Sequence, residues 1–165
     1  MKYLLDSNTF IEAYGRYYGM SICPAYWSWL VRAHEAGQIL SINLVKQELE
    51  KGGDDLASWV VDNQNIFIGE ERLAIQQAFQ GVAHHISTLT QMNPGTHEEF
   101  LSGADPWLIA TAIATNSTVV TQEVLKPSNI KRKIHIPNVC ESLGVPYMNT
   151  FEMLHKLEAE FILSA

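Results

Sequence analysis

Short apolar runs alternate with longer segments of helical periodicity along this chain. The runs predict strands at 1–5, 38–42, 117–123 and 145–148, and the run at 66–69 fits either type of element. Apolar residues three or four positions apart predict helices at 9–13, 24–36, 44–53, 54–63, 71–92, 103–116, 137–144 and 150–161, with a further helix start within 93–100. This alternation predicts an α/β fold with a mainly parallel sheet that helices cover on both faces.

Several residues mark where the helices are expected to begin and end. Asn8, Asn43 and either Asn149 or Thr150 precede helical periodicity, and their side chains commonly cap a helix N-terminus. Gly37 follows a predicted helix at the position where a left-handed backbone conformation is common. These signals set the expected boundaries.

Length and composition indicate one domain that spans residues 1–165. With 165 residues and 47% hydrophobic content, the chain can bury about two-thirds of its unfolded surface, and it has no repeat, low-complexity tract or linker. The net charge of −7 argues against a basic surface that coats nucleic acid non-specifically. It leaves a nucleic-acid substrate open, because bound divalent cations would set the potential that a phosphate meets.

Cysteine usage and hydropathy favour a cytoplasmic protein. Cys23 and Cys140 are far apart and outside any CxxC pair, which argues against a zinc site or a disulfide framework. Only one lysine and a short apolar run precede Asp6, and no stretch of about 18 apolar residues occurs. Neither export nor a membrane span is therefore expected.

Four acidic residues stand where the predicted elements would direct them to one cleft. Asp6 and Glu123 end two predicted strands, and ligands of open α/β sheets gather beyond the carboxyl ends of the strands. Glu48 and Asp105 each share a predicted helix face with an apolar stripe. Each acid also has a purely structural interpretation. Asp6 and Asp105 can cap helices. Glu48 can lie at the edge of its apolar stripe, and Glu123 can be an ordinary loop acid.

Taken together, these carboxylates would repel one another unless cations were bound. Hard oxygen ligands without histidine or thiolate favour Mg²⁺ or Mn²⁺. Such ions activate water for attack on a phosphodiester, which is the chemistry of a metal-dependent nuclease. Asn8 and Thr121 would then hold metal-bound water near Asp6.

The segments that carry these acids resemble those of PIN-domain ribonucleases, a family that includes many prokaryotic toxins. YLLDSNTFIEA is similar to the first strand of the family with its Asp-x-Asn signature, SINLVKQEL to the second acidic motif, GADPWLIATA to the third, and VVTQE to the Thr-x-Asp segment. The resemblance spans nearly the whole chain, although the region 54–100 is longer than in the smallest members. It implies a three-layer fold around a parallel sheet of five strands.

Position by position, the resemblance implies that Asp6, Glu48, Asp105 and Glu123 are the catalytic residues and metal ligands. Glu123 stands where the family more often has aspartate, and its longer side chain could reach a metal through water. The implied activity is RNA cleavage by water that Mg²⁺ or Mn²⁺ activates. The implied partners are a second copy of the chain and, for a toxin, an antitoxin protein that covers the cleft.

Basic and aromatic residues outside these motifs have two interpretations each. One set could grip substrate phosphates or stand in a solvated loop: Lys126, Lys131, Arg132 and Lys133. The other could stack on unpaired bases or belong to the core or a dimer surface: Tyr17, Tyr18, Tyr26, Trp27 and Trp29. The histidines lack metal spacing and are interpreted as surface or structural residues: His84, His85 and His135.

Two other functions are compatible with parts of the pattern. A phosphatase of the haloacid-dehalogenase type also begins with a strand that ends in Asp, but it requires a second Asp where this chain has Asn8. A non-catalytic binding module could keep the fold and use the cleft for a partner, and the full set of acids argues against it. The sequence favours a metal-dependent endoribonuclease that is the toxin of a toxin–antitoxin pair.

Overall fold

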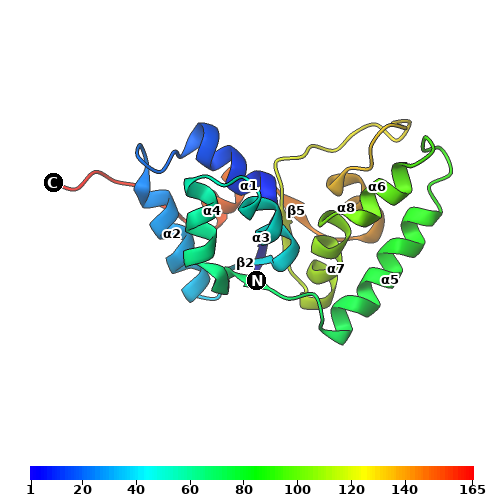
Figure 1. Ribbon diagram of the computed structural model, residues 1–165, viewed down its shortest axis with the longest axis horizontal. Coiled ribbons are helices and arrows are strands. Elements are labelled where there is room, and N and C mark those ends of the chain that lie inside the picture. Colours follow the sequence, from blue (N-terminus) through cyan, green and yellow to red (C-terminus); the bar gives the residue numbers. More distant parts are fainter.

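A computed structural model describes all 165 residues and has a five-stranded sheet at its centre (Figure 1). The strands are β1 (Tyr3–Leu5), β2 (Ile39–Ile42), β3 (Phe67–Ile68), β4 (Thr118–Val120) and β5 (Tyr147–Met148). The helices are α1 (Ser7–Glu12), α2 (Pro24–Glu35), α3 (Asn43–Glu50), α4 (Asp55–Asp62), α5 (Leu73–Ser87), α6 (Thr96–Ser102), α7 (Asp105–Thr115), α8 (Ile136–Leu143) and α9 (Thr150–Lys156), with a π-helical turn at Ala13–Tyr17 and a 3₁₀ turn at Gln64–Ile66. Every strand pairing is parallel, so the predicted α/β class is confirmed.

Strand β1 lies at the centre of the sheet, which has the order β3-β2-β1-β4-β5. Leu4 and Leu5 are fully buried, as expected for a parallel strand that is covered on both faces. The hydroxyl of Ser41 in β2 donates a hydrogen bond of 2.6 Å to the carbonyl oxygen of Leu5. The end of β1, where Asp6 follows, is therefore held by its neighbour.

Two groups of helices cover the sheet. In Figure 1, α2 and α4 lie on one side of the strands, and α5, α6, α7 and α8 lie on the other. Helices α2 and α3 contact β2, whereas α7 contacts both β2 and β4. Helix α5 packs along α7, where the rings of Phe79 and Trp107 stack with centroids 3.9 Å apart. Helix α7 is apolar on nearly every side because it lies between the sheet and α5.

The aromatic residues near the N-terminus contribute to the core. Tyr26 is fully buried, and its ring stacks on that of Tyr18 with centroids 4.5 Å apart. Trp27 is also buried and donates its indole N–H to the carbonyl oxygen of Tyr18 at 2.7 Å. Phe161, from the other end of the chain, meets the ring of Tyr26 edge-on. The core interpretation is confirmed for Tyr26 and Trp27, and base stacking by these two rings is excluded.

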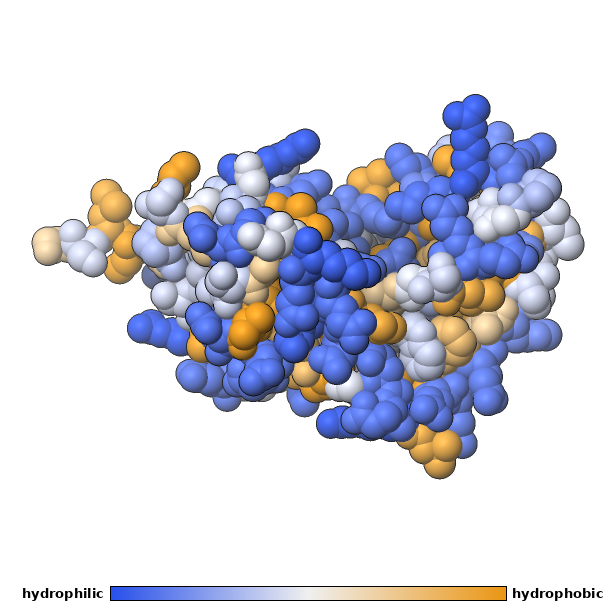
Figure 2. All heavy atoms as spheres, viewed as in Figure 1, coloured by the Kyte–Doolittle hydropathy of each residue, from blue (hydrophilic) through white to orange (hydrophobic).

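One face of the molecule is mostly polar, and the C-terminal tail carries exposed apolar residues. Figure 2 shows a largely hydrophilic face with small separate hydrophobic patches. Ile162 and Leu163 are 81% and 97% exposed, in the tail that projects at the C-terminal end in Figure 1. None of the helices has both the length and the apolar character needed to cross a membrane.

The helix caps differ in part from the prediction. Asp6, not Asn8, is the N-cap of α1, because its carboxylate accepts the next backbone N–H at 2.7 Å. Asn43 is the first residue of α3 and not its cap; instead, the distant carboxylate of Glu70 accepts the N–H of the second helical residue at 2.9 Å. Asn149 caps α9 as predicted. Local sequence cannot show a cap that comes from a residue far along the chain.

Leu5→Ala is expected to lower the free energy of unfolding by about 2–5 kcal/mol, because it leaves a cavity beside the residue that begins the acidic site. Leu73→Ala makes the same chemical change at a position that is 70% exposed, and should cost less than about 0.5 kcal/mol. Urea denaturation of both variants and the wild type measures these values. Equal losses would contradict the central position of β1 in the core.

Candidate functional site

Three of the four predicted acids follow neighbouring strands of the sheet. Asp6 comes directly after β1, and Glu48 lies on α3, which begins immediately after β2. Glu123 comes after β4, but farther from it than predicted, because β4 ends at Val120. The fourth acid, Asp105, is the first residue of α7. Since β2, β1 and β4 are adjacent and parallel, their carboxyl ends lie at one edge of the sheet.

Asp6 is a buried carboxylate that is held from two sides. The residue is 3% exposed. Its Oδ1 atom accepts the backbone N–H of Ser7 at 2.7 Å, and its Oδ2 atom accepts the hydroxyl of Thr121 at 2.9 Å. The backbone N–H of Asp6 donates to the carbonyl oxygen of Val120 at 2.9 Å. The first turn of α1 and the end of β4 therefore orient this carboxylate.

The Thr121 hydroxyl joins three parts of the site. It donates to Asp6 and accepts two hydrogen bonds, from the Asn8 amide at 3.2 Å and from the backbone N–H of Glu123 at 3.1 Å. Asn8 also accepts the backbone N–H of Gln122 at 2.9 Å. One donated and two accepted bonds are the full capacity of a hydroxyl. Thr121 and Asn8 thus attach the segment after β4 to Asp6, and Thr121 has no bond left for the metal-bound water that the sequence suggested.

The carboxylate of Glu123 accepts hydrogen bonds from the first residue of α8 and from the segment just before it. Its Oε1 atom accepts Lys133 Nζ at 2.9 Å, and its Oε2 atom accepts the backbone N–H of Ile136 at 2.8 Å. His135 Nδ1 lies 3.6 Å from Oε2. The bond to Ile136 satisfies one of the N–H groups that a helix start leaves unpaired. Of the four acids, Glu123 is the one that forms an ion pair.

Glu48 and Asp105 line one open hollow of about 170 Å³, whose other charged residues are Glu99 and Lys133. Glu48 is exposed and not turned inward as predicted, because the hollow opens to solvent beside α3. Ala104 is the N-cap of α7, so Asp105 does not have the capping role that was its structural alternative. Neither Glu48 nor Asp105 takes part in an ion pair of the protein.

Burial and mutual repulsion shift the protonation of two of these acids. Burial raises the pKa of Asp6 to about 6; the hydrogen bond from Thr121 opposes this shift, and the charge of Glu123 adds to it. Burial, together with the charges of Asp6, Glu123 and Glu48, raises the pKa of Asp105 to about 7. Ionised carboxylates at this edge of the sheet are therefore only partly compensated by groups of the protein.

The chemistry of these residues fits a hard divalent cation. All four are oxygen donors, and Asp6, Glu48 and Asp105 lack a cationic side chain of their own. As the side chains are placed, no group of three or more His, Cys, Asp or Glu residues could hold a metal ion. Asp6, Glu48 and Asp105 are the residues that would hold one, with Glu123 beside them, after their carboxylates had moved closer together.

Two of the four predicted basic residues line the acidic hollow or the pocket next to it, and the other two are exposed to solvent. Lys133 lines the acidic hollow, and both Lys133 and Lys126 line a neighbouring pocket. Lys131 and Arg132 are exposed and line neither space. The sequence motifs do not connect His135 with the site, because its closeness to Glu123 depends on how the loop folds back.

A parallel five-stranded sheet covered by helices, with acids beyond the ends of β1, β2 and β4, defines an α/β protein. The chain belongs to the family described as "Domain of unknown function (DUF4411)", whose model matches residues 3–161. No curated protein matches its sequence.

Among solved structures, the crystal structure of VapBC2 from Rickettsia felis bound to a DNA fragment from their promoter contains a chain with a similar fold. The TM-score is 0.52 at 15% sequence identity, and the match covers 90% of this chain and 98% of that chain. At this identity the likeness concerns the fold alone. It confirms the predicted PIN-like fold class.

Thr121→Val should lower the free energy of unfolding by about 1–3 kcal/mol, because Asp6 loses a donor and two N–H groups lose their acceptor. Thr121→Ser keeps the hydroxyl and should cost about 1 kcal/mol, from the lost methyl group. Urea denaturation compares the two variants. A smaller loss for valine than for serine would show that the hydroxyl does not hold the site together.

Asp105→Asn should raise the free energy of unfolding by about 1 kcal/mol at pH 8 in the presence of a chelator, because it removes a partly buried negative charge beside other acids. In the wild type, a carboxyl whose pKa is raised on folding binds more protons in the folded than in the unfolded state. The contribution of Asp105 to stability should therefore increase as the pH falls from about 8 to about 5.

Urea denaturation at several pH values measures this difference between Asp105→Asn and the wild type. The control is Asp62→Asn, the same chemical change at an exposed position of α4, which should leave the pH dependence of the wild type unchanged. A gain for Asp105→Asn that grew as the pH fell would contradict the assignment.

Proposed function

We propose that this protein is a metal-dependent endoribonuclease that hydrolyses RNA phosphodiesters, and that it is the toxin of a toxin–antitoxin pair. One observation carries the proposal: Asp6, Glu48 and Asp105 gather at the carboxyl edge of a parallel sheet without cationic partners. Ligands of such sheets bind at this edge. The PIN-like fold and the motif resemblance support the choice of RNA as substrate.

Asp6, Glu48 and Asp105, with Glu123 at the margin, would hold Mg²⁺ or Mn²⁺. When bound, such an ion supplies the positive charge that activates water and stabilises the charge developing on the phosphate. The side chains of the protein supply the electrostatic environment of the ion. The low exposure of Asp6 strengthens the field of its carboxylate relative to that of a carboxylate in water.

Two further residues would serve the reaction by position and charge. Thr121 keeps the Asp6 carboxylate in a fixed orientation through a hydrogen bond of 2.9 Å, so Asp6 itself would need little reorganisation while the other carboxylates moved toward a bound cation. Lys133 stands beside the hollow with more than half of its side chain exposed, where it would attract a phosphate of the substrate.

The proposal includes a protein partner that covers the acidic hollow. The similar solved structure is of VapBC2 together with promoter DNA. On this chain, Val124 and Leu125 follow Glu123 directly and are 60% and 51% exposed. They line a separate hollow beside Tyr17 and Phe151, so a partner that covers the acids and extends along this segment would bury them. A homodimer is also part of the proposal, on the basis of the motif resemblance.

Incubation with transfer, ribosomal and messenger RNA, followed by mapping of the new ends, tests the activity. Cleavage should require Mn²⁺ or Mg²⁺, and Asp6→Asn and Asp105→Asn should each lower the rate by about 100-fold or more, because a charged group of the metal site is lost. Asp62→Asn, the exposed control on α4, should cleave like the wild type.

Titration calorimetry with Mn²⁺ gives a second measurement that does not depend on finding the right RNA. The wild type should bind the ion, and Asp105→Asn should bind it at least about tenfold more weakly. Intact RNA in every reaction together with no ion binding would overturn the proposal and favour a non-catalytic binding module. Turnover of a simple phosphate ester that depends on Asp6 would favour a phosphatase instead.

A further inference from the structure

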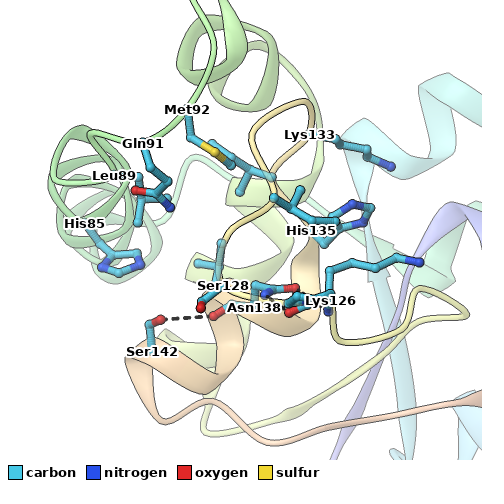
Figure 3. Close-up of a pocket in the computed structure, with 14 residues that line it drawn as sticks. His85, Leu89, Gln91, Met92, Lys126, Ser128, Lys133, His135, Asn138 and Ser142 are labelled. Carbon is cyan, nitrogen blue, oxygen red and sulfur yellow. Dashed lines mark hydrogen bonds between the residues drawn. The ribbon is translucent and has the colours of Figure 1, made fainter.

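A second pocket shares a wall with the acidic hollow (Figure 3). It has a volume of about 150 Å³ and lies between the C-terminal part of α5, the segment that leads from Lys126 to His135, and α8. Lys133 and Ile134 line both this pocket and the hollow that contains Glu48 and Asp105. A molecule that occupies the pocket would therefore lie next to the proposed reaction site.

The lining of this pocket combines apolar surface with basic groups. Its hydrophobic residues are Leu89, Met92, Ile130, Ile134 and Val139. Lys126, Lys133, His85 and His135 add basic or imidazole side chains. No acidic residue lines it, although the chain has 18 acids and a net charge of −7. Such a surface suits a ligand that has a flat, largely apolar part and a negatively charged group.

Hydrogen bonds hold the walls of the pocket in place. The Asn138 side chain accepts the backbone N–H of Lys126 at 3.0 Å and donates to its carbonyl oxygen at 2.8 Å. The backbone N–H of Asn93 donates to the carbonyl oxygen of Lys131 at 2.9 Å. The bond from Lys133 to Glu123 holds the end of the same segment. Because the walls are already ordered, a ligand would bind with little loss of conformational entropy.

Both lysines and His135 lie at one end of the pocket. Figure 3 shows Lys126, His135 and Lys133 on one side, with both ammonium groups pointing the same way, and His85 on the opposite side. Lys133 Nζ is also 2.9 Å from Glu123 Oε1. The basic end is therefore the end that faces the acids.

We propose that this pocket binds one nucleotide of a single-stranded RNA, beside the phosphodiester that is cleaved. The base lies against the apolar wall and the phosphate lies between Lys126 and Lys133. The inference rests on the proposed function and adds a site that distinguishes one base of the RNA from another. Single strands have unstacked bases that can enter such a pocket, whereas the bases of a duplex are paired and stacked.

Binding of the four ribonucleoside 5′-monophosphates, followed by NMR or calorimetry, tests this inference without catalysis. The protein is Asp105→Asn in the presence of a chelator, and inorganic phosphate is the reference ligand. At least one nucleotide should bind about tenfold or more tightly than phosphate, a difference of about 1.4 kcal/mol. Equal affinity for the four nucleotides and inorganic phosphate would show that the pocket binds only the phosphate group, and would overturn the inference.

Two variants identify the pocket as the place of binding. Lys126→Glu should weaken nucleotide binding by about tenfold or more, whereas Lys156→Glu, the same charge change at an exposed position of α9, should change it less than about twofold. Ser142→Trp adds bulk at an exposed position of the lining and should block the base without changing the charge. Wild-type affinity in both Lys126→Glu and Ser142→Trp would overturn the inference.

RNA cleavage then separates this inference from the function on which it rests. A base preference at one position beside the cut, present in the wild type and lost in Ser142→Trp while cleavage continues, supports both. Metal-dependent cleavage with an unchanged preference in Ser142→Trp overturns the pocket and leaves the nuclease. Nucleotide binding that depends on Lys126, in a protein that cuts no RNA, supports the pocket and overturns the nuclease.

Discussion

The hydrogen bond between the Thr121 hydroxyl and the Asp6 carboxylate is the interaction on which the site depends. Asp6 ends the central strand and is buried, and an unpartnered carboxylate in that position would be very costly. Thr121 supplies the donor at 2.9 Å because β4 runs parallel to β1 in the register that pairs Leu5 with Val120. The same hydroxyl accepts bonds from Asn8 and from the backbone of Glu123, so one side chain links the first helix to the segment after β4.

The second constraint is the repulsion among the acids at this edge. Burial and neighbouring charges raise the pKa values of Asp6 and Asp105. The ionised forms of these two carboxyl groups therefore destabilise the folded protein. Lys133 offsets part of the charge through Glu123. Sites built for binding or catalysis often carry strain or charge of this kind, since function and stability compete for the same residues.

Lys133 also connects the acidic hollow with the pocket beside α8, because it lines both. The proposed metal site and the proposed base-binding pocket therefore lie on opposite sides of the segment that contains Lys133 and Ile134. Side chains on either side of the segment hold it in place, Glu123 before it and Asn138 after it. A change in that segment is therefore expected to act on cleavage and on sequence preference together.

The sequence by itself determined the α/β class, the places of β1, β2, β4 and β5, and the positions of Asp6, Glu48 and Asp105 relative to the strands and helices, because the apolar periodicity of buried elements is a local property of the sequence. It left β3 open and placed Glu123 at the end of a strand that stops at Val120. Only the tertiary structure decided that Thr121 is saturated by internal bonds, that Glu123 pairs with Lys133 and the start of α8, and that Glu48 stands exposed at the rim of a hollow. These features depend on contacts between residues from different parts of the chain. The pocket beside α8 was beyond prediction for the same reason, because α5, the basic segment and α8 form it only when they pack together.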